Sequence, residues 1–396
     1  MNKKISIEQF AISGGKPFFE EKRHVNKPST PNKQKYTKLI EQVFQSGVYS
    51  NNGPLVQELE EKIARHLGVR HCVLSNNGTL ALALLLIALD IKGHVIVPSF
   101  TFISTPHLLN LFGITPIFCD IDKNSHNLSI QHCEALVSEK TTAIIATHLW
   151  GIACNVEGLQ KLADKKGVQL VFDASHSFGC KTNNQYIGGN GIAEFFSFHA
   201  TKFFHTFEGG CITTNDTVLA KKLKEVRNFG FIGYDKVAGL GINAKMTEVC
   251  AAAGLVNLTS LEQTLKKTQE NYLLYKEHLN DIPGISLIRY DLRETNSHYI
   301  VLTINEDEFG LKRDKIIEIL HKENVIARRY FYPGCHKMKL RSGSSETRLA
   351  ITETLADKIM LLPGGASITE QDILAVCSLL KKIYLCSDEL GELMAL

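Results

Sequence analysis

The chain has no long hydrophobic segment. Its longest apolar run extends from Leu80 to Leu89, far short of the ~20 residues that a membrane-spanning helix needs. The N-terminal residues MNKKISIEQFAISGG contain two lysines but no apolar stretch of the kind that a secretory signal requires. We therefore expect a cytoplasmic protein that does not associate with membranes.

The chain also has no large excess of positive or negative residues. The 44 Lys and Arg residues face 41 Asp and Glu residues, too near a balance for the basic surface that nucleic-acid binding needs. The ten cysteines form no CxxC pair, which predicts free, mostly buried thiols in a reducing compartment. The fifteen histidines show no HExxH or other compact metal spacing, so we expect neither nucleic acid nor a catalytic metal as a partner.

Two nucleotide-binding motifs are absent or out of context. No GxxxxGK[ST] sequence occurs, and the GxGxxA match at 239–244 has no apolar strand before it and no βαβ unit around it. We therefore expect no dinucleotide site. What remains is the composition of an ordinary globular protein, 44% hydrophobic and 21% charged over 396 residues, long enough for more than one domain.

Residues 54 to 215 alternate helical periodicity with short apolar, β-branched runs. This pattern is typical of an α/β fold with a mostly parallel sheet. The predicted strands are 71–75, 94–99, 114–121, 141–148, 168–174, 193–198 and 209–214. We predict an N-terminal arm and helix (1–45), a large domain (46–245), a long linking helix (246–280) and a smaller C-terminal α/β domain (281–396).

Lys202 is the first candidate for chemistry, in the segment SFHATK that follows an apolar strand. A lysine that forms a Schiff base with pyridoxal phosphate (PLP) lies in a loop near a phosphate site, where its pKa is lowered. Ser197, five residues earlier, offers a hydroxyl to the same phosphate. Taken alone, a lysine in a loop is more often simply a solvated charge.

Asp173 ends the apolar run VQLVFD, where open α/β sheets bind their ligands. A carboxylate there would keep the PLP pyridine nitrogen protonated, which the electron-sink chemistry of the cofactor needs. An Asp that only caps the next turn fits the segment equally well. His176 is a candidate for a position beside the cofactor ring, with a purely structural histidine as the competing interpretation.

Two further segments provide binding candidates. Gly78 and Thr79 lie between a strand and a helical run, where backbone N–H groups and a hydroxyl bind phosphate, although N-capping alone also explains such residues. Phe102 follows the 94–99 strand and is the candidate for stacking on the pyridine ring, with Phe100 as the second choice. Both aromatic residues also fit a core position.

Together these segments resemble the DegT/DnrJ/EryC1/StrS sugar aminotransferase family, PLP enzymes of fold type I. Between about residues 46 and 365, the following fragments occur in the same order as in the family: SNNGTLAL, FCDID, ATHLWG, VFDASHSFG, SFHATKFFHTFEGGCITTND, RNFGF, GINAKMTEVCAA and RRYFYP. The SFHATK and EGG block is the most specific of these fragments. The resemblance implies a large domain with a mostly parallel mixed sheet and a smaller C-terminal domain.

The resemblance also implies a role for each candidate residue. Lys202 would be the Schiff-base lysine and Asp173 the partner of the pyridine nitrogen. In addition, His176 and Phe102 would flank the ring, while Gly78, Thr79 and Ser197 would bind the phosphate. Asn243 resembles the residue that reaches the cofactor phosphate of the neighbouring subunit, so a homodimer with shared active sites is expected.

The implied reaction is a ping-pong transamination between an amino acid, usually glutamate, and a nucleotide-linked keto-deoxysugar. The fragments are similar to those of enzymes that make 4-amino-4,6-dideoxyglucose on dTDP. His205 and the ISGGKP segment at 12–17 depart from that pattern and leave open a 3-keto-sugar or keto-cyclitol acceptor. A PLP-dependent sugar dehydratase is disfavoured because it would replace Lys202 by histidine, and a non-catalytic PLP-binding module is disfavoured by the intact cofactor positions.

Overall fold

The computed structural model describes residues 6–341 and 348–395. Its main feature is a seven-stranded mixed sheet in which only β10 runs antiparallel to its neighbours. In spatial order the strands are β2 (His71–Ser75), β10 (Gly210–Thr214), β9 (Ala193–Ser197), β6 (Gln169–Asp173), β5 (Thr141–Thr147), β3 (His94–Pro98) and β4 (Thr115–Cys119). The predicted mostly parallel sheet is confirmed, and every strand lies within its predicted segment.

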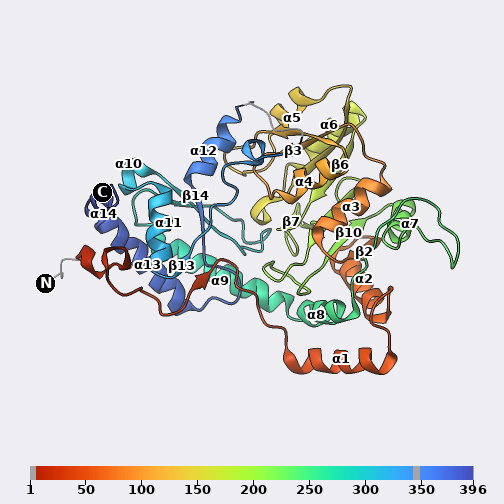
Figure 1. The fold of residues 1–396 in the computed structure, drawn as a ribbon, viewed down its shortest axis with the longest axis horizontal. Helices are drawn as coiled ribbons and strands as arrows, with labels where there is room; N and C mark the ends of the chain where they lie inside the picture. Colours follow the sequence, from red (N-terminus) through yellow and green to blue (C-terminus); the bar gives the residue numbers. More distant parts are fainter. Residues whose placement is uncertain (1–5, 342–347, 396) are drawn as a thin grey trace.

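Helices cover both faces of this sheet (Figure 1). Successive strand residues point to opposite faces, so Val73 packs in one hydrophobic cluster and Leu74 in another. One face is covered by α3 (Gly78–Ala88), α4 (Ser104–Leu111) and α7 (Thr217–Val226), the other by α2 (Pro54–Leu67), α5 (Ile130–Leu136), α6 (Val156–Lys166) and α8 (Glu248–Leu258). Burial on both faces explains why the strands are nearly continuous apolar runs.

The stretch predicted as one linking helix is two helices, α8 and α9 (Leu261–Leu279). Thr259 and Ser260 separate them. Their hydroxyls donate to the carbonyl oxygens of Val256 and Asn257, and such local side-chain bonds compete with helical continuation. The apolar spacing of the stretch does not reveal this break.

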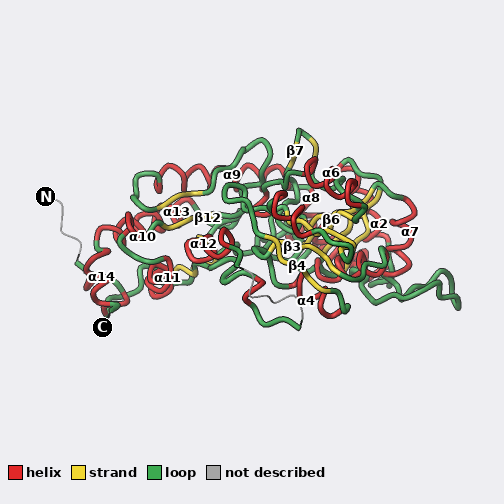
Figure 2. The backbone as a smooth tube through the Cα atoms, turned by 90° about the horizontal axis from the view of Figure 1, so that it is seen from above, coloured by secondary structure: helices red, strands yellow, loops and turns green. Residues whose placement is uncertain are grey.

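A second, three-stranded antiparallel sheet is formed by β11 (Ile285–Leu287), β12 (Ile300–Ile304) and β14 (Ile359–Leu362). Its residues pack with α9, α11 (Arg313–Lys322) and α13 (Glu370–Leu385). The remaining C-terminal helices are α10 (Glu306–Phe309), α12 (Ala350–Lys358) and α14 (Ser387–Leu393). Figure 2 shows α10, α11, α13 and α14 towards the opposite end of an elongated molecule from α2 and α7. The small C-terminal sheet is as expected, while the exact domain boundaries stay a prediction.

The N-terminal segment runs along both parts. After the short 3-10 helices Ile7–Gln9 and Ala11–Ser13, β1 (Arg23–His24) pairs in parallel with β13 (Val325–Ile326), and α1 (Lys33–Ser46) follows. A small hairpin joins β7 (Lys181–Thr182) to β8 (Gln185–Tyr186), and further 3-10 helices occupy Leu149–Gly151 and Cys335–Lys337.

None of the ten cysteines forms a disulfide, and all but Cys250 are buried, as predicted. Among the described residues, none of the helices is both long enough and apolar enough to cross a bilayer.

Candidate active site

A cavity of about 500 Å³ opens where the parallel strands end. Asp173 and Ser197 are the last residues of β6 and β9, and Phe102 follows β3. Seven of the eight predicted site residues line the cavity: Gly78, Thr79, Phe102, Asp173, His176, Ser197 and Lys202. The parallel topology brings them together, because the carboxyl ends of parallel strands share one edge of the sheet.

The phosphate candidates meet at the start of α3. Asn77 caps this helix by accepting the Leu80 N–H at 2.8 Å, and the first N–H groups of a helix lack carbonyl partners within it. A Cβ atom on Gly78 would lie 2.9 Å from Cβ of Ser197, so only glycine lets helix and strand approach this closely. Helix N–H groups with two hydroxyls beside them form a donor set that fits a phosphate.

Lys202 lies in the loop between β9 and β10. Its backbone N–H donates to the His199 carbonyl at 2.9 Å, and the His298 ring Nε2 lies 3.0 Å from the Thr201 carbonyl oxygen. Burial lowers the pKa of Lys202 to about 8, although the negative charge of Asp173 opposes that shift. The neutral, nucleophilic form of the amine is therefore much more populated near neutral pH than in an exposed lysine, whose pKa is ~10.4.

Asp173 caps the following turn, as one interpretation of the sequence predicts, and it also faces the cavity. Its Oδ1 accepts the Ser175 N–H at 2.9 Å and so caps the following turn. The same buried carboxyl group also lines the cavity. Burial raises its pKa, and hydrogen bonds from Ser175 and the charge of Lys202 act in the opposite direction. The turn fixes the carboxyl group in place for a cationic partner inside the cavity.

His176 is held between aromatic rings, with the Tyr299 centroid at 4.3 Å and the Trp150 centroid at 5.5 Å. Burial, followed by the charges of Lys202 and His298, lowers its pKa well below the ordinary value. The ring is therefore neutral at neutral pH and presents an aromatic surface to the cavity.

The two phenylalanine candidates differ in their exposure to the cavity. Phe102 lines the cavity and is 59% exposed, whereas Phe100 is fully buried and packs edge-on against Trp150 and Phe331. The first choice therefore faces the cavity, and the second belongs to the core.

Asn243 does not line the cavity of its own chain. It is exposed, in an isolated bridge with Asn228, and the carbonyl of the next residue, Ala244, accepts the Asn76 N–H at 2.9 Å. This surface position is compatible with a contact to a second subunit.

Several residues that line the cavity were not predicted from the sequence. Tyr299, Tyr330 and Phe331 enter the cavity from the part of the chain that follows the large sheet, and Asn26 enters from the N-terminal arm. The RRYFYP fragment was a usable signal for Tyr330 and Phe331. Nothing in the local pattern points to Asn26, because only the tertiary fold brings the arm to this place.

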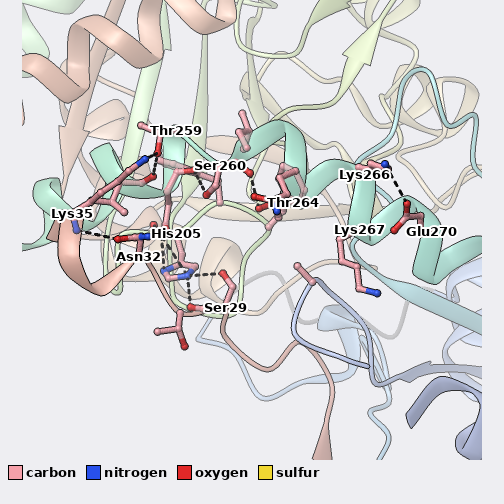
Figure 3. Close-up of a pocket in the computed structure, with 18 residues that line it drawn as sticks. Ser29, Asn32, Lys35, His205, Thr259, Ser260, Thr264, Lys266, Lys267 and Glu270 are labelled. Atoms are coloured by element: carbon pink, nitrogen blue, oxygen red, sulfur yellow. Dashed lines mark hydrogen bonds and ion pairs between the residues drawn. The ribbon is translucent and has the colours of Figure 1, made fainter. Parts of the chain in front are cut away.

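A second cavity, of about 730 Å³, lies against the residues that follow Lys202. Figure 3 shows His205 facing Ser29, with Lys35 and the start of α9 nearby. The His205 Nε2 lies 3.1 Å from the Ser29 hydroxyl and 3.0 Å from its carbonyl oxygen. His205 is thus buried and holds the N-terminal arm to the loop that carries Lys202.

Comparisons with known proteins identify the family of this chain. The model of the DegT/DnrJ/EryC1/StrS aminotransferase family matches residues 31–381. The dTDP-4-amino-4,6-dideoxy-D-glucose transaminases of Escherichia coli and Shigella dysenteriae are 35% and 32% identical, covering 90% and 93% of this chain and 97% and 99% of theirs.

A solved structure extends the agreement to three dimensions. The crystal structure of DesI in the presence of its TDP-sugar product has a TM-score of 0.93 and 38% identity, over 98% of this chain and 99% of that one. The chain therefore belongs to the DegT/DnrJ/EryC1/StrS aminotransferase family and is a PLP-dependent sugar aminotransferase.

Proposed function

We propose that this enzyme moves an amino group from an amino acid, with L-glutamate as the expected donor, to a nucleotide-linked 4-keto-6-deoxyhexose. The proposed acceptor is dTDP-4-keto-6-deoxyglucose and the product dTDP-4-amino-4,6-dideoxyglucose. Near full-length similarity to two transaminases of that name supports this choice. The observation that carries it is the cavity in which Lys202, Asp173 and the α3 N-terminus converge.

Bound PLP would supply an electron sink that makes the donor's α-proton removable. We assign that proton transfer to Lys202, because its neutral amine is available near its pKa of about 8. The amine would take the proton from the donor's α-carbon and deliver it to the C4′ atom of the cofactor. In the second half-reaction the same atom would move the proton in the reverse direction.

The remaining cavity residues would bind and orient. Asp173 would hold a proton on the pyridine nitrogen, since a cation beside it stabilises its ionised form. His176, which burial keeps neutral, and Phe102 would enclose the ring. Gly78, Thr79 and Ser197 would bind the phosphate through helix N–H groups and hydroxyls.

We further propose a homodimer in which Asn243 reaches the cofactor phosphate of the second copy. Large apolar side chains are exposed on two segments, 44–49 and 229–240, the second of which precedes Asn243 in the chain: Phe44, Val48, Tyr49, Phe229, Phe231, Ile232, Tyr234, Val237 and Leu240. Contiguous exposed apolar surface is typical of protein interfaces. A second copy covering these segments would bury them and complete both sites.

The acceptor is tested with a panel of dTDP-, UDP- and GDP-linked 3-keto and 4-keto sugars, assayed for amination with L-glutamate. We expect the dTDP-linked 4-keto-6-deoxyglucose to react with the highest kcat/KM. A preference for 3-keto sugars or keto-cyclitols would overturn the proposed acceptor while leaving transamination intact. Failure of every amino acid to convert bound PLP to its pyridoxamine form would overturn transamination itself.

The role of Lys202 is tested by Lys202→Ala. Borohydride reduction should attach PLP covalently to the wild-type chain and leave the variant unlabelled, and turnover should fall at least about 10³-fold. Lys245→Ala is the matched control, because burial lowers the pKa of that lysine as well but it does not line the cavity. Covalent PLP in the Lys202 variant would show that another lysine is responsible.

A further inference from the structure

The segment 23–32 of the N-terminal arm is tied to both parts of the molecule. At its start, β1 pairs with β13, and Arg23 Nε lies 2.8 Å from an Asp372 carboxylate oxygen. Towards its end, Ser29 contacts His205 in the segment after Lys202 (Figure 3). The middle of the arm is therefore held beside the active-site cavity.

Asn26 lies in the middle of this arm and lines the cavity. It is 4% exposed, and its φ of 53° is in the left-handed region that asparagine tolerates better than most residues. Among the described residues, nothing donates a hydrogen bond to its Oδ1. A buried carbonyl oxygen without a hydrogen-bond donor is unfavourable, so a bound ligand that donates to Oδ1 would be stabilised here.

The chemistry of the cavity indicates which partner fits. Lys202 is the single lysine or arginine among its described lining residues, whereas Tyr299, Tyr330 and Phe331 form an aromatic wall. An amino-acid carboxylate could accept from the Asn26 amide nitrogen but would leave Oδ1 without a donor. A hydroxyl both donates and accepts, so it satisfies the amide in either orientation.

We propose that Asn26 is a specificity-determining residue that hydrogen-bonds a ring hydroxyl of the sugar acceptor. This assignment rests on the proposed function, because it requires a hydroxylated sugar in the cavity. The arm delivers the amide, and its attachment to both β13 and His205 fixes where the amide lies. Asn26 would then act in the sugar half-reaction and not in the donor half-reaction.

The test separates the two half-reactions in single-turnover absorbance measurements on the holoenzyme. Asn26→Gly removes the amide while keeping a backbone that tolerates positive φ, and Asn26→Asp keeps an acceptor oxygen. Asn183→Gly is the matched control, an exposed asparagine with a φ of 51° in the β7–β8 turn. Each protein is given L-glutamate, then the preferred keto sugar and its 2-deoxy and 3-deoxy analogues.

We expect wild-type enzyme and Asn183→Gly to react with the parent sugar about 10- to 100-fold faster than with one deoxy analogue in the single-turnover sugar half-reaction. Asn26→Gly should react with the parent sugar as slowly as with that analogue, whereas Asn26→Asp should retain part of the preference. The rate with glutamate should change far less than the rate with sugar.

Two outcomes would overturn this role. Unaltered discrimination in Asn26→Gly would show that no hydroxyl is bound there, and equal loss in both half-reactions would show that Asn26 merely supports the arm. If wild-type enzyme reacts with glutamate but aminates none of the sugars, the proposed acceptor fails and this assignment fails with it.

Discussion

At the scale of single residues, the site depends on the opposed effects of burial and charge on Lys202. Burial lowers the pKa of this amine to about 8, and the carboxylate of Asp173 raises it. In PLP-free protein, acetylation of Lys202 followed by mass spectrometry should therefore be half-maximal near pH 8, because only the neutral amine reacts. Exposed lysines, with an ordinary pKa near ~10.4, should require higher pH.

The variant Asp173→Asn tests whether the charge of Asp173 raises the pKa of Lys202. Removal of the negative charge takes away the influence that raises the Lys202 pKa, so the acetylation midpoint should move below pH 8. An unchanged midpoint, or one that moves upward, would contradict the assigned interaction between these two residues.

Gly78 is the second residue for which the structure predicts the effect of a substitution. In Gly78→Ala the new Cβ would lie 2.9 Å from Cβ of Ser197, which forces the start of α3 away from β9. PLP affinity, measured by fluorescence titration, should fall about tenfold or more, equivalent to ~1.4 kcal/mol. Gly391→Ala in α14 is the control, since its Cβ would meet nothing closer than 3.4 Å; equal PLP affinity in both variants would contradict the phosphate assignment.

At the scale of elements, Glu248 joins α8 to α2. Its carboxylate accepts the N–H groups of Leu55 and Val56 at 2.8 and 3.0 Å, and the side chain is buried. It therefore satisfies two of the free N–H groups at the α2 N-terminus, where a negative charge is also favoured by the helix dipole. Glu248 thereby holds the start of α2 against α8.

Glu248→Ala should lower the free energy of unfolding by about 3 kcal/mol, because two charge-assisted hydrogen bonds are lost and two buried N–H groups stay unpaired. Urea denaturation measures the change. Glu61→Ala serves as control, since this glutamate is 69% exposed and pairs only with Arg65, a kind of pair worth at most about 0.5 kcal/mol. Similar losses in the two variants would show that burial of Glu248 is not what matters.

At the scale of the whole molecule, the exposed apolar segments 44–49 and 229–240 predict the quaternary state. Sedimentation should give twice the 44.1 kDa chain mass. Tyr234→Asp combined with Leu240→Asp, at positions 100% and 84% exposed, should shift the protein toward monomer and reduce activity, because shared sites would be incomplete.

The variant Asn243→Ala should leave the dimer intact and weaken PLP binding. A fully active monomer would contradict the shared site.

The large sheet and seven of the eight residues proposed for the site, which line one cavity, can be predicted from local sequence patterns. Strands buried on both faces are apolar along their whole length, so β2, β3, β5, β6, β9 and β10 are visible in the chain, as is the α2 stripe of Leu55, Leu59, Ile63 and Leu67. The positions of Asp173, Ser197 and Lys202 at strand ends or in a loop, and of Gly78 at a helix start, are local properties too. Parallel topology then brings these residues to one edge.

Features that depend on contacts between distant parts of the chain are visible only in the folded structure. Thr259 and Ser260 end α8 through bonds to neighbouring carbonyls, although the apolar spacing continues across them. Phe100 and Phe102 have the same local pattern, and packing against Trp150 and Phe331 assigns one to the core. Asn26 reaches the cavity because contacts more than 170 residues away, at His205 and β13, hold the arm there. Local periodicity carries no information about such pairings, since their free energy is gained only when the chain is folded.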